Sequence, residues 1–301
     1  MTEGVVNLLK PPGMTSSDAV TDARHIFQIK RIGHTGTLDP GAAGVLPLCV
    51  GRATRLFDLL MEKQKEYLAE ICFGYATDTQ DSYGTAGESG GRVPERDELE
   101  AVLPCFTGNI EQTAPMYSAV SVGGKRLYQL AREGAETVER KRAVTVSALE
   151  IKAQTARDRY LLKVECSRGT YVRTLCHDIG QALYAPAHLS FLLRTRSGEF
   201  RVEEAFTIAE LRQMKEENRL HQAVIPIERV LSHIGEVRFE GLSAKNQRLL
   251  RNGANIAHPA LAAYSVPTQL RVYDNGAFLG VGEAEAGALH ITLNLADGGG
   301  A

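Results

Sequence analysis

Apolar residues at the start of the chain follow two periods, one typical of strands and the other typical of helices. The run from Val5 to Leu9 ends at Lys10-Pro-Pro-Gly13, which predicts a strand followed by a turn. Ser16 or Ser17 is placed to cap the next helix, because a serine hydroxyl accepts hydrogen bonds from the free amide groups of a first turn. The apolar residues of this helix recur at helical spacing: Ala19, Val20, Ala23, Ile26 and Phe27.

The following segments predict a strand, a short helix, a second strand and a loop. Val45 to Val50 is continuously apolar and predicts a buried strand, and Ala53 to Met61 predicts a short helix. In KEYLAEICFG (65–74) the residues Tyr67, Ala69, Ile71 and Phe73 alternate with their neighbours, which is the period of a strand. The stretch TDTQDSYGTAGESGG (77–91) has no core pattern and predicts a loop.

Strands and helices continue to alternate as far as residue 183. Helices are predicted from Pro94 to Leu103, from Lys125 to Glu133 and from Tyr171 to Leu183, the first opened by a proline that a first turn tolerates. Residues 143–152 and 159–167 predict strands. Because the alternation has no regular unit of repetition, it favours an α+β fold with a mixed, largely antiparallel sheet over a doubly wound fold.

The pattern changes after about residue 233. Three short strands are predicted, and the dipeptides Asn275-Gly276 and Ala286-Gly287 join them; the strands are Leu270 to Asp274, Ala277 to Glu283 and Leu289 to Leu295. An Asn-Gly pair favours a tight hairpin turn. We therefore expect two domains, residues 1–232 and a small β-rich domain of residues 233–301.

Composition fits a soluble protein with a real core. The 301 residues are 44% hydrophobic, yet no apolar run approaches the roughly 20 residues that a membrane helix requires. The first ten residues lack the basic region of a signal peptide, so we expect a cytoplasmic protein. The cysteines lack the C-x-x-C spacing of zinc or redox sites, and we expect all five to be reduced and buried: Cys49, Cys72, Cys105, Cys166 and Cys176.

Charge is unevenly distributed although the formal net charge is only −2. Residues 121–175 contain twelve lysines and arginines against six acidic residues, whereas residues 76–101 contain seven acidic residues against two arginines. A basic segment suits a polyanionic partner, but an ordinary charged surface explains this distribution of charge equally well.

The stretch GHTGTLDPGAAG (33–44) places one aspartate, Asp39, among four glycines. Pro40 forces Asp39 out of helical geometry, so the carboxylate is presented from a stiff, extended corner. The glycines allow sharp bends and the close approach of a partner. A solvent-facing turn accounts for the pattern as well as a functional carboxylate does.

Three familiar chemistries do not match this stretch. A phosphate loop requires a lysine that does not follow Gly41 or Gly44, and a serine hydrolase requires G-x-S-x-G. A metal site requires further ligands at suitable spacing, whereas His34 and Asp39 have none nearby in the sequence. A lone nucleophilic or acid–base carboxylate remains.

Five motifs in order resemble the bacterial tRNA pseudouridine-55 synthases, the TruB family. They are KPPGMTSSDAV (10–20), GHTGTLDPGAAGVLPLCVGRATRL (33–56), KEYLAEICFG (65–74), TDTQDSYG (77–84) and CSRGTYVRTL (166–175). Residues 233–301 resemble, more weakly, the small RNA-binding PUA domain. Ser121 stands where the family commonly has a lysine, so the resemblance does not extend to one phosphate contact of the family.

The resemblance implies isomerisation of uridine to pseudouridine in the T-loop of tRNA, without cofactor or metal. It implies that Asp39 is the nucleophile, attacking either C1′ of the ribose or C6 of the uracil, and that Arg173 pairs with it. A carboxylate in a dry pocket needs an opposite charge to stay ionised. The base must also be extruded from its loop and held by stacking. Tyr67 is implied to pack against the uracil and to take the C5 proton.

Further residues are assigned by the same resemblance. Tyr171 lines the pocket, His34 fills the space that the flipped base leaves, and Lys10 and Asp81 support the pocket. A thumb-like insertion at about 120–145 is implied to cover the RNA, with Lys125, Arg126, Arg132 and Arg142 near phosphates. The partner is the T-arm of tRNA, and we expect a monomer. The alternatives are an RNA-binding protein without the reaction and a synthase that acts on another RNA.

Overall fold

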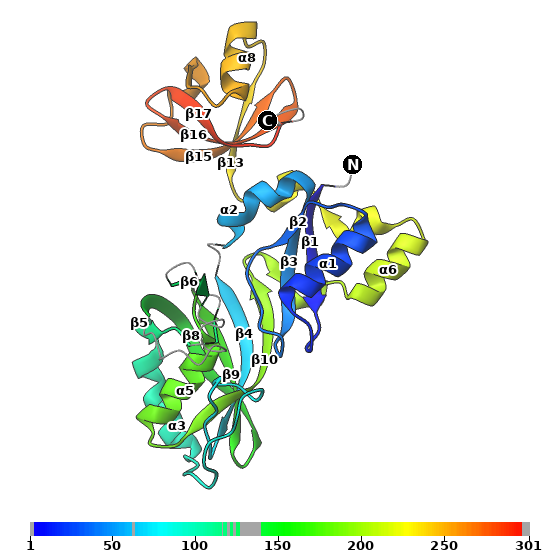
Figure 1. Cartoon of the computed structure of the whole chain (residues 1–301). Coiled ribbons are helices and arrows are strands. Elements are labelled where there is room, and N and C mark those ends of the chain that lie inside the picture. The colour runs from blue at the N-terminus through cyan, green and yellow to red at the C-terminus, as the bar shows by residue number, and fades with distance from the viewer. Residues whose placement is uncertain are drawn as a thin grey trace.

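The computed structural model describes residues 3–61, 64–115, 117–118, 121–122, 125–126 and 140–296. Two larger sheets organise most of these residues, and a short two-stranded sheet pairs residues 121–122 with 125–126. Of the two larger sheets, the small sheet of residues 235–294 lies at one end of the molecule (Figure 1). The larger sheet has ten strands in the main order β12-β1-β3-β10-β4-β9-β8-β5, with β2 on β3 and β11 on β10. All its pairs are antiparallel except β3 with β10. The predicted α+β fold with a mixed, largely antiparallel sheet is confirmed.

The strands and helices have the following bounds. The large sheet contains β1 (Gly4–Lys10), β2 (Ile32–His34), β3 (Ala43–Val50), β4 (Lys65–Phe73), β5 (Gly108–Thr113), β8 (Lys141–Ala156), β9 (Arg159–Cys166), β10 (Ala187–Ser197), β11 (Phe200–Arg201) and β12 (Val224–Ile225). The small sheet contains β13 (Gly235–Phe239), β14 (Ile256–Ala257), β15 (Thr268–Asp274), β16 (Ala277–Glu285) and β17 (Ala288–Asn294). The helices are α1 (Ser16–Phe27), α2 (Phe57–Met61), α3 (Arg96–Val102), α5 (Val172–Ala182), α6 (Ile208–Glu216), α7 (Ile227–Val230) and α8 (Ala244–Arg251). None of the helices in these ranges has the length and apolar character needed to cross a bilayer.

Apolar side chains join the two sheets. One cluster unites Val5 and Val45 of the large sheet with Leu231, with Val281 of β16 and with Leu295 just after β17. Two arginines that follow β3 reinforce this contact, since Arg52 Nη1 donates to Leu295 O over 2.7 Å and Arg55 Nη1 donates to Asn294 O over 2.5 Å. The small sheet is therefore anchored to β1 and to β3, and β3 begins where the 33–44 loop ends.

The hairpins of the small sheet form as their turn residues predict. Asn275 and Gly276 have φ of 48° and 78°, and Ala286 and Gly287 have the same pair of values. Positive φ at both central residues is the geometry of tight hairpin turns, which matches the twist of the flanking strands. The three strands predicted for this part of the chain are confirmed as β15, β16 and β17.

Four local predictions are wrong, either wholly or at one end of the predicted element. Thr15, not Ser16 or Ser17, caps α1, because its side chain accepts from Asp18 N in a capping box. Pro94 precedes α3, whose N-cap is Glu95. Lys125 and Arg126 form the short strand β7, paired with β6 (Ser121–Val122), rather than the start of a helix; residues 127–133 lie outside the described ranges. Cys105 is exposed, whereas the other four cysteines are buried.

Gly44 makes close contact with the centre of the sheet. Its φ is +121°, and a Cβ there would lie 2.2 Å from the carbonyl oxygen of Arg194 on β10. We expect Gly44→Ala to lower the free energy of unfolding by about 3 kcal/mol or more, since backbone strain and overpacking add. Gly13 is a matched control, because its φ is +87° and its Cβ position is open. Gly13→Ala should cost only about 1–2 kcal/mol. Urea unfolding of both variants measures the difference, and equal losses would contradict the steric explanation.

Candidate active site

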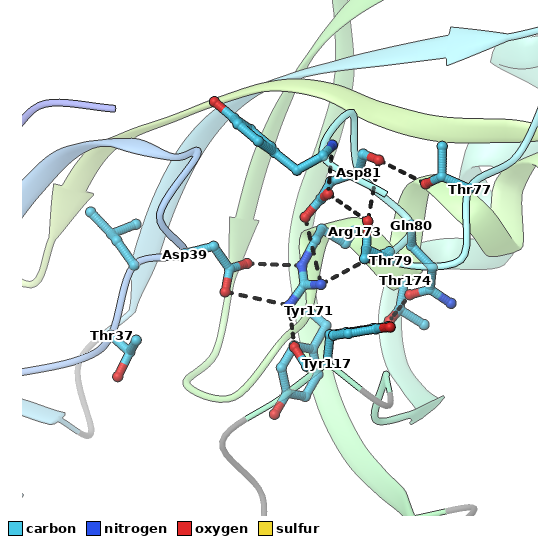
Figure 2. A network of polar contacts seen from close by, with 12 residues as sticks. Thr37, Asp39, Thr77, Thr79, Gln80, Asp81, Tyr117, Tyr171, Arg173 and Thr174 are labelled. Atoms are coloured by element: carbon cyan, nitrogen blue, oxygen red, sulfur yellow. Dashed lines mark hydrogen bonds and ion pairs between the residues drawn. The ribbon is translucent and has the colours of Figure 1, made fainter. Parts of the chain in front are cut away.

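Asp39 and Arg173 form a two-point ion pair between distant parts of the chain. Arg173 Nε lies 2.8 Å from Asp39 Oδ2, and Arg173 Nη2 donates to Asp39 Oδ1 over 3.3 Å (Figure 2). The arginine side chain is only 5% exposed, whereas that of Asp39 is 40% exposed. A guanidinium held this way fixes both position and orientation of the carboxylate. The predicted pairing is present, with one carboxylate edge open to solvent.

The N-terminal turn of α5 presents Arg173. Tyr171 is the N-cap residue of α5, and Gln112 of β5 holds its backbone from both sides. Gln112 Oε1 accepts from Tyr171 N over 3.0 Å, and Gln112 Nε2 donates to Tyr171 O over 3.2 Å. The start of the helix is thereby tied to the neighbouring sheet, so that Arg173 projects toward Asp39.

The 77–83 loop completes the arginine's surroundings. Arg173 Nη1 donates to Thr79 O over 2.9 Å and lies 3.6 Å from Asp81 Oδ2, and Nη2 donates to Tyr117 O over 3.0 Å. Asp81 is fixed in turn, since its Oδ1 accepts from Thr79 Oγ1 over 2.6 Å and from Tyr83 N over 3.0 Å (Figure 2). These contacts tie Asp81 to the Arg173 guanidinium, and its role in supporting a substrate pocket stays a prediction.

Side chains from outside the 33–44 loop hold its backbone in place. The guanidinium of Arg194 donates to Gly36 O (3.1 Å) and Thr37 O (3.4 Å), and to Val45 O (2.7 Å). Ser16 Oγ bridges Leu38, accepting from its N over 2.9 Å and donating to its O over 3.0 Å. The Lys10 ammonium reaches Pro40 O at 3.4 Å. Carbonyl groups on both sides of Asp39 are thus satisfied, and the loop is rigidly placed.

A small cavity opens beside the ion pair. Asp39, Asp81 and Arg173 line it together with residues of β10, including Leu189 and Leu192. Its volume is about 20 Å³, which is room for roughly one water molecule. Tyr67 and Tyr171 are not among its lining residues. The cavity as it stands is too small to enclose a nucleobase.

Two family models match consecutive parts of this chain. The model of the TruB family pseudouridylate synthase N-terminal domain matches residues 24–172, and the tRNA pseudouridylate synthase B C-terminal domain matches residues 173–232. The chain is 44% identical to tRNA pseudouridine synthase B of Caldanaerobacter subterraneus, over 94% of this chain and 95% of that one. The chain belongs to the TruB family of pseudouridylate synthases.

Other relatives agree with this assignment. The Bacillus subtilis tRNA pseudouridine synthase B is 43% identical over 86% of this chain and 85% of its own. Among solved structures, a chain of a Cbf5-Nop10-Gar1 complex superimposes with a TM-score of 0.69 at 30% identity, covering 94% of this chain and 79% of that chain. Residues 233–301 lie beyond both family-model matches.

Arg194 is the site residue of this TruB-family chain that the sequence did not reveal. It is fully buried on β10, directly between Tyr67 of β4 and Gly44 of β3. Burial raises the pKa of Tyr67, so its phenol is neutral, and the Arg194 charge opposes part of that rise. The sequence gives little sign of this residue: Arg194 follows Leu192 by two positions, the spacing of one face of a strand, but no strand is predicted for this stretch.

The remaining predicted residues lie around the loop. His34 ends β2; burial and the Arg194 charge lower its pKa, so its ring is neutral, and its buried Nδ1 has no hydrogen-bond partner among the described residues. The guanidinium of Arg142 lies over the ring of Tyr171, 6.0 Å from its centroid. Arg132 and the side chains of Lys125 and Arg126 lie outside what the structure describes.

Lys10 makes the stability of this chain depend on pH. It is buried, and its Nζ also donates to Pro11 O and Met14 O over 2.8 Å each. Burial, opposed in part by the nearby Asp39 charge, lowers its pKa from 10.5 to about 8. Between these two values the unfolded chain binds more protons than the folded chain, so Lys10 makes the free energy of unfolding rise with pH by up to about 1.4 kcal/mol per pH unit.

The Lys10→Met variant lacks this titration. We therefore expect the stability of the unsubstituted chain relative to Lys10→Met to increase as the pH rises from about 8 toward 10.5. Urea unfolding of both proteins across this window is the measurement. Parallel stability curves would show that Lys10 titrates at its ordinary pKa in the folded chain.

Proposed function

We propose that this chain isomerises uridine 55 in the T-loop of tRNA to pseudouridine. The Asp39–Arg173 ion pair is the observation that carries the proposal. A carboxylate held at two points by a buried arginine keeps one edge free, beside a cavity at the surface. Such a group is suited to adding to an electrophilic carbon. The family membership and the names of the relatives support tRNA as the substrate.

The reaction needs no external reactant. The N1–C1′ bond of the uridine breaks, the uracil turns, and a C5–C1′ bond forms while the C5 proton leaves and N1 gains a proton. Asp39 contributes as the nucleophile, through an adduct at C1′ of the ribose or at C6 of the uracil, and is released in its original state. The site's own carboxylate and cation suffice for this role, and no cofactor is part of the proposal.

Tyr67 is proposed to pack against the uracil and to relay the C5 proton. Tyr67 lies opposite Arg194 in the sheet register, and Arg194 also donates to Gly36 O and Thr37 O of the 33–44 loop, which is consistent with contact to a base that enters at Asp39. Because its phenol is neutral, it accepts a proton only as it gives its own away. Tyr171 and His34 are proposed to contact the extruded base and the T-loop, respectively.

The large and the small sheet support a proposal of two domains with different functions. We propose a catalytic domain of residues 1–232 with a thumb-like insertion at about 120–145, and a PUA-like RNA-binding domain of residues 233–301. Arg142, at the edge of the insertion and over Tyr171, is placed to meet a phosphate near the site. A monomer in the cytoplasm that binds the T-arm is the form we propose.

Incubation with unmodified tRNA followed by mapping of pseudouridine tests the proposal directly. A single new pseudouridine at position 55 is the expected result. Tight binding without product would favour a non-catalytic RNA-binding protein. Product at a different position, or only in another RNA, would favour a synthase of different specificity. Either outcome would overturn the proposal as stated.

A further inference from the structure

Two exposed aromatic side chains border the Asp39 cavity. Five large hydrophobic side chains are exposed in the described part of the chain, and two of them, Tyr83 and Phe191, line this cavity. Tyr83 is 71% exposed and Phe191 is 47% exposed. The proposed reaction gives neither residue a role. Large apolar surface left open beside a functional site is typical of a ligand contact.

Tyr83 is exposed but firmly placed. Its backbone N donates to Asp81 Oδ1 over 3.0 Å, and Asp81 Oδ2 lies 3.6 Å from Arg173 Nη1. Its ring lies against Gly41 of the 33–44 loop, where a Cβ would be only 2.0 Å from ring atom Cε2. Glycine at position 41 is therefore what admits the ring. The ring is supported from the protein side while most of its surface faces solvent.

Phe191 projects from an irregular part of β10. The register between β10 and β4 shifts between Leu189 and Phe191, which is the signature of a bulge. Ser82, next to Tyr83, is bound to this bulge, since its N donates to Leu189 O over 3.1 Å. The bulge and the 77–83 loop thereby bring both aromatic residues to the rim of one cavity.

We propose that Tyr83 and Phe191 form a stacking site for an unpaired base of the substrate RNA that neighbours the base at Asp39. This inference rests on the proposed function. Proteins that recognise unpaired RNA stack splayed bases on aromatic side chains. Extruding a uridine also disrupts the stacking of its neighbours, so an aromatic surface beside the cavity stabilises the opened loop. Continuity of the aromatic pair with Asp39 and Arg173 in one cavity points to RNA as the occupant.

Equilibrium binding tests this site in the catalytically blocked Asp39→Asn background. The ligands are T-arm hairpins, either intact or with a single loop nucleotide made abasic. Tyr83→Ala and Phe191→Ala should each weaken binding of the intact hairpin by about 5- to 100-fold. Tyr83→Phe should bind normally, because stacking needs the ring and not the hydroxyl. Tyr184→Ala is the matched control, since Tyr184 is 91% exposed and follows the far end of α5 from Arg173.

The abasic hairpins identify the base that stacks. One abasic position next to the target should weaken binding in the Asp39→Asn protein but cause no further loss in Tyr83→Ala. The stacking site would be contradicted if every abasic hairpin lost affinity equally. It would also be contradicted if Tyr83→Ala and Phe191→Ala lowered the free energy of unfolding but left the affinity for the intact hairpin unchanged. Product mapping with the unsubstituted chain is run in parallel. Pseudouridine formation with unchanged variant affinities overturns only this inference, whereas the absence of product overturns the proposed function.

Discussion

Asp39→Asn should abolish pseudouridine formation while leaving tRNA binding nearly intact. The substitution keeps the size of the side chain but removes the charge and the nucleophilic oxygen. Loss of a nucleophile commonly lowers kcat by about 10⁴-fold or more. Arg173 keeps its bonds to Thr79 O and Tyr117 O and its contact with Asp81, so the surroundings of residue 39 should stay folded.

The measurement pairs single-turnover pseudouridine formation with a tRNA binding assay. We expect product below detection and an affinity within about fivefold of the unsubstituted chain, a change of less than about 1 kcal/mol. Asp58→Asn on α2 is the control, because Asp58 is exposed, and it should retain full activity. Product formation by Asp39→Asn at an undiminished rate would show that Asp39 is not the nucleophile.

The sequence predicted the 33–44 loop better than it predicted the strands and side chains that hold this loop in place. Asp39 stood out as an Asp-Pro pair among four glycines, a pattern that an ordinary turn explains as well, and the family resemblance decided between the two. Arg173 lies 134 residues away, so only the family resemblance connected the two. Half of the arginine's partners are backbone carbonyls, namely Thr79 O and Tyr117 O, and a carbonyl group leaves no trace in residue type.

Strand β10 shows the physical reason for the largest omission. It is the central strand that pairs with both β3 and β4, and it carries Arg194, Leu192 and Phe191. Register shifts between Leu189 and Phe191, and again between Arg194 and Arg196, break its period of two. A strand with bulges and a buried arginine does not show the alternation from which strands are predicted. The irregularities that hid the strand are the features that place its side chains at the site.

Arg173→Met should lower the free energy of unfolding more than Asp39→Asn does, and it should also reduce activity, because the guanidinium holds both the carboxylate and the surrounding backbone. Removal of the guanidinium leaves Asp39 and Asp81 without their shared cation, and leaves two carbonyl groups without a donor. Breaking a buried pair costs about 3–5 kcal/mol, and because Asp39 is partly exposed we expect about 2–3 kcal/mol in the free energy of unfolding. Activity should fall by at least about 10²-fold, since the carboxylate loses its orientation.

Two further variants separate the effect of charge from the effect of geometry at position 173, and a third variant is a control. Arg173→Lys restores the charge but not the fork that binds two oxygens at once, so it should recover stability more than kcat. Arg173→Met combined with Asp39→Asn should be more stable than Arg173→Met alone, because the unpaired charge at residue 39 is gone. Arg212→Met is the control, since its ion pair with Asp22 is exposed and should be worth at most about 1 kcal/mol. Urea unfolding and single-turnover rates of the set decide the matter: strictly additive losses in the double variant would mean that the two side chains do not act as a unit.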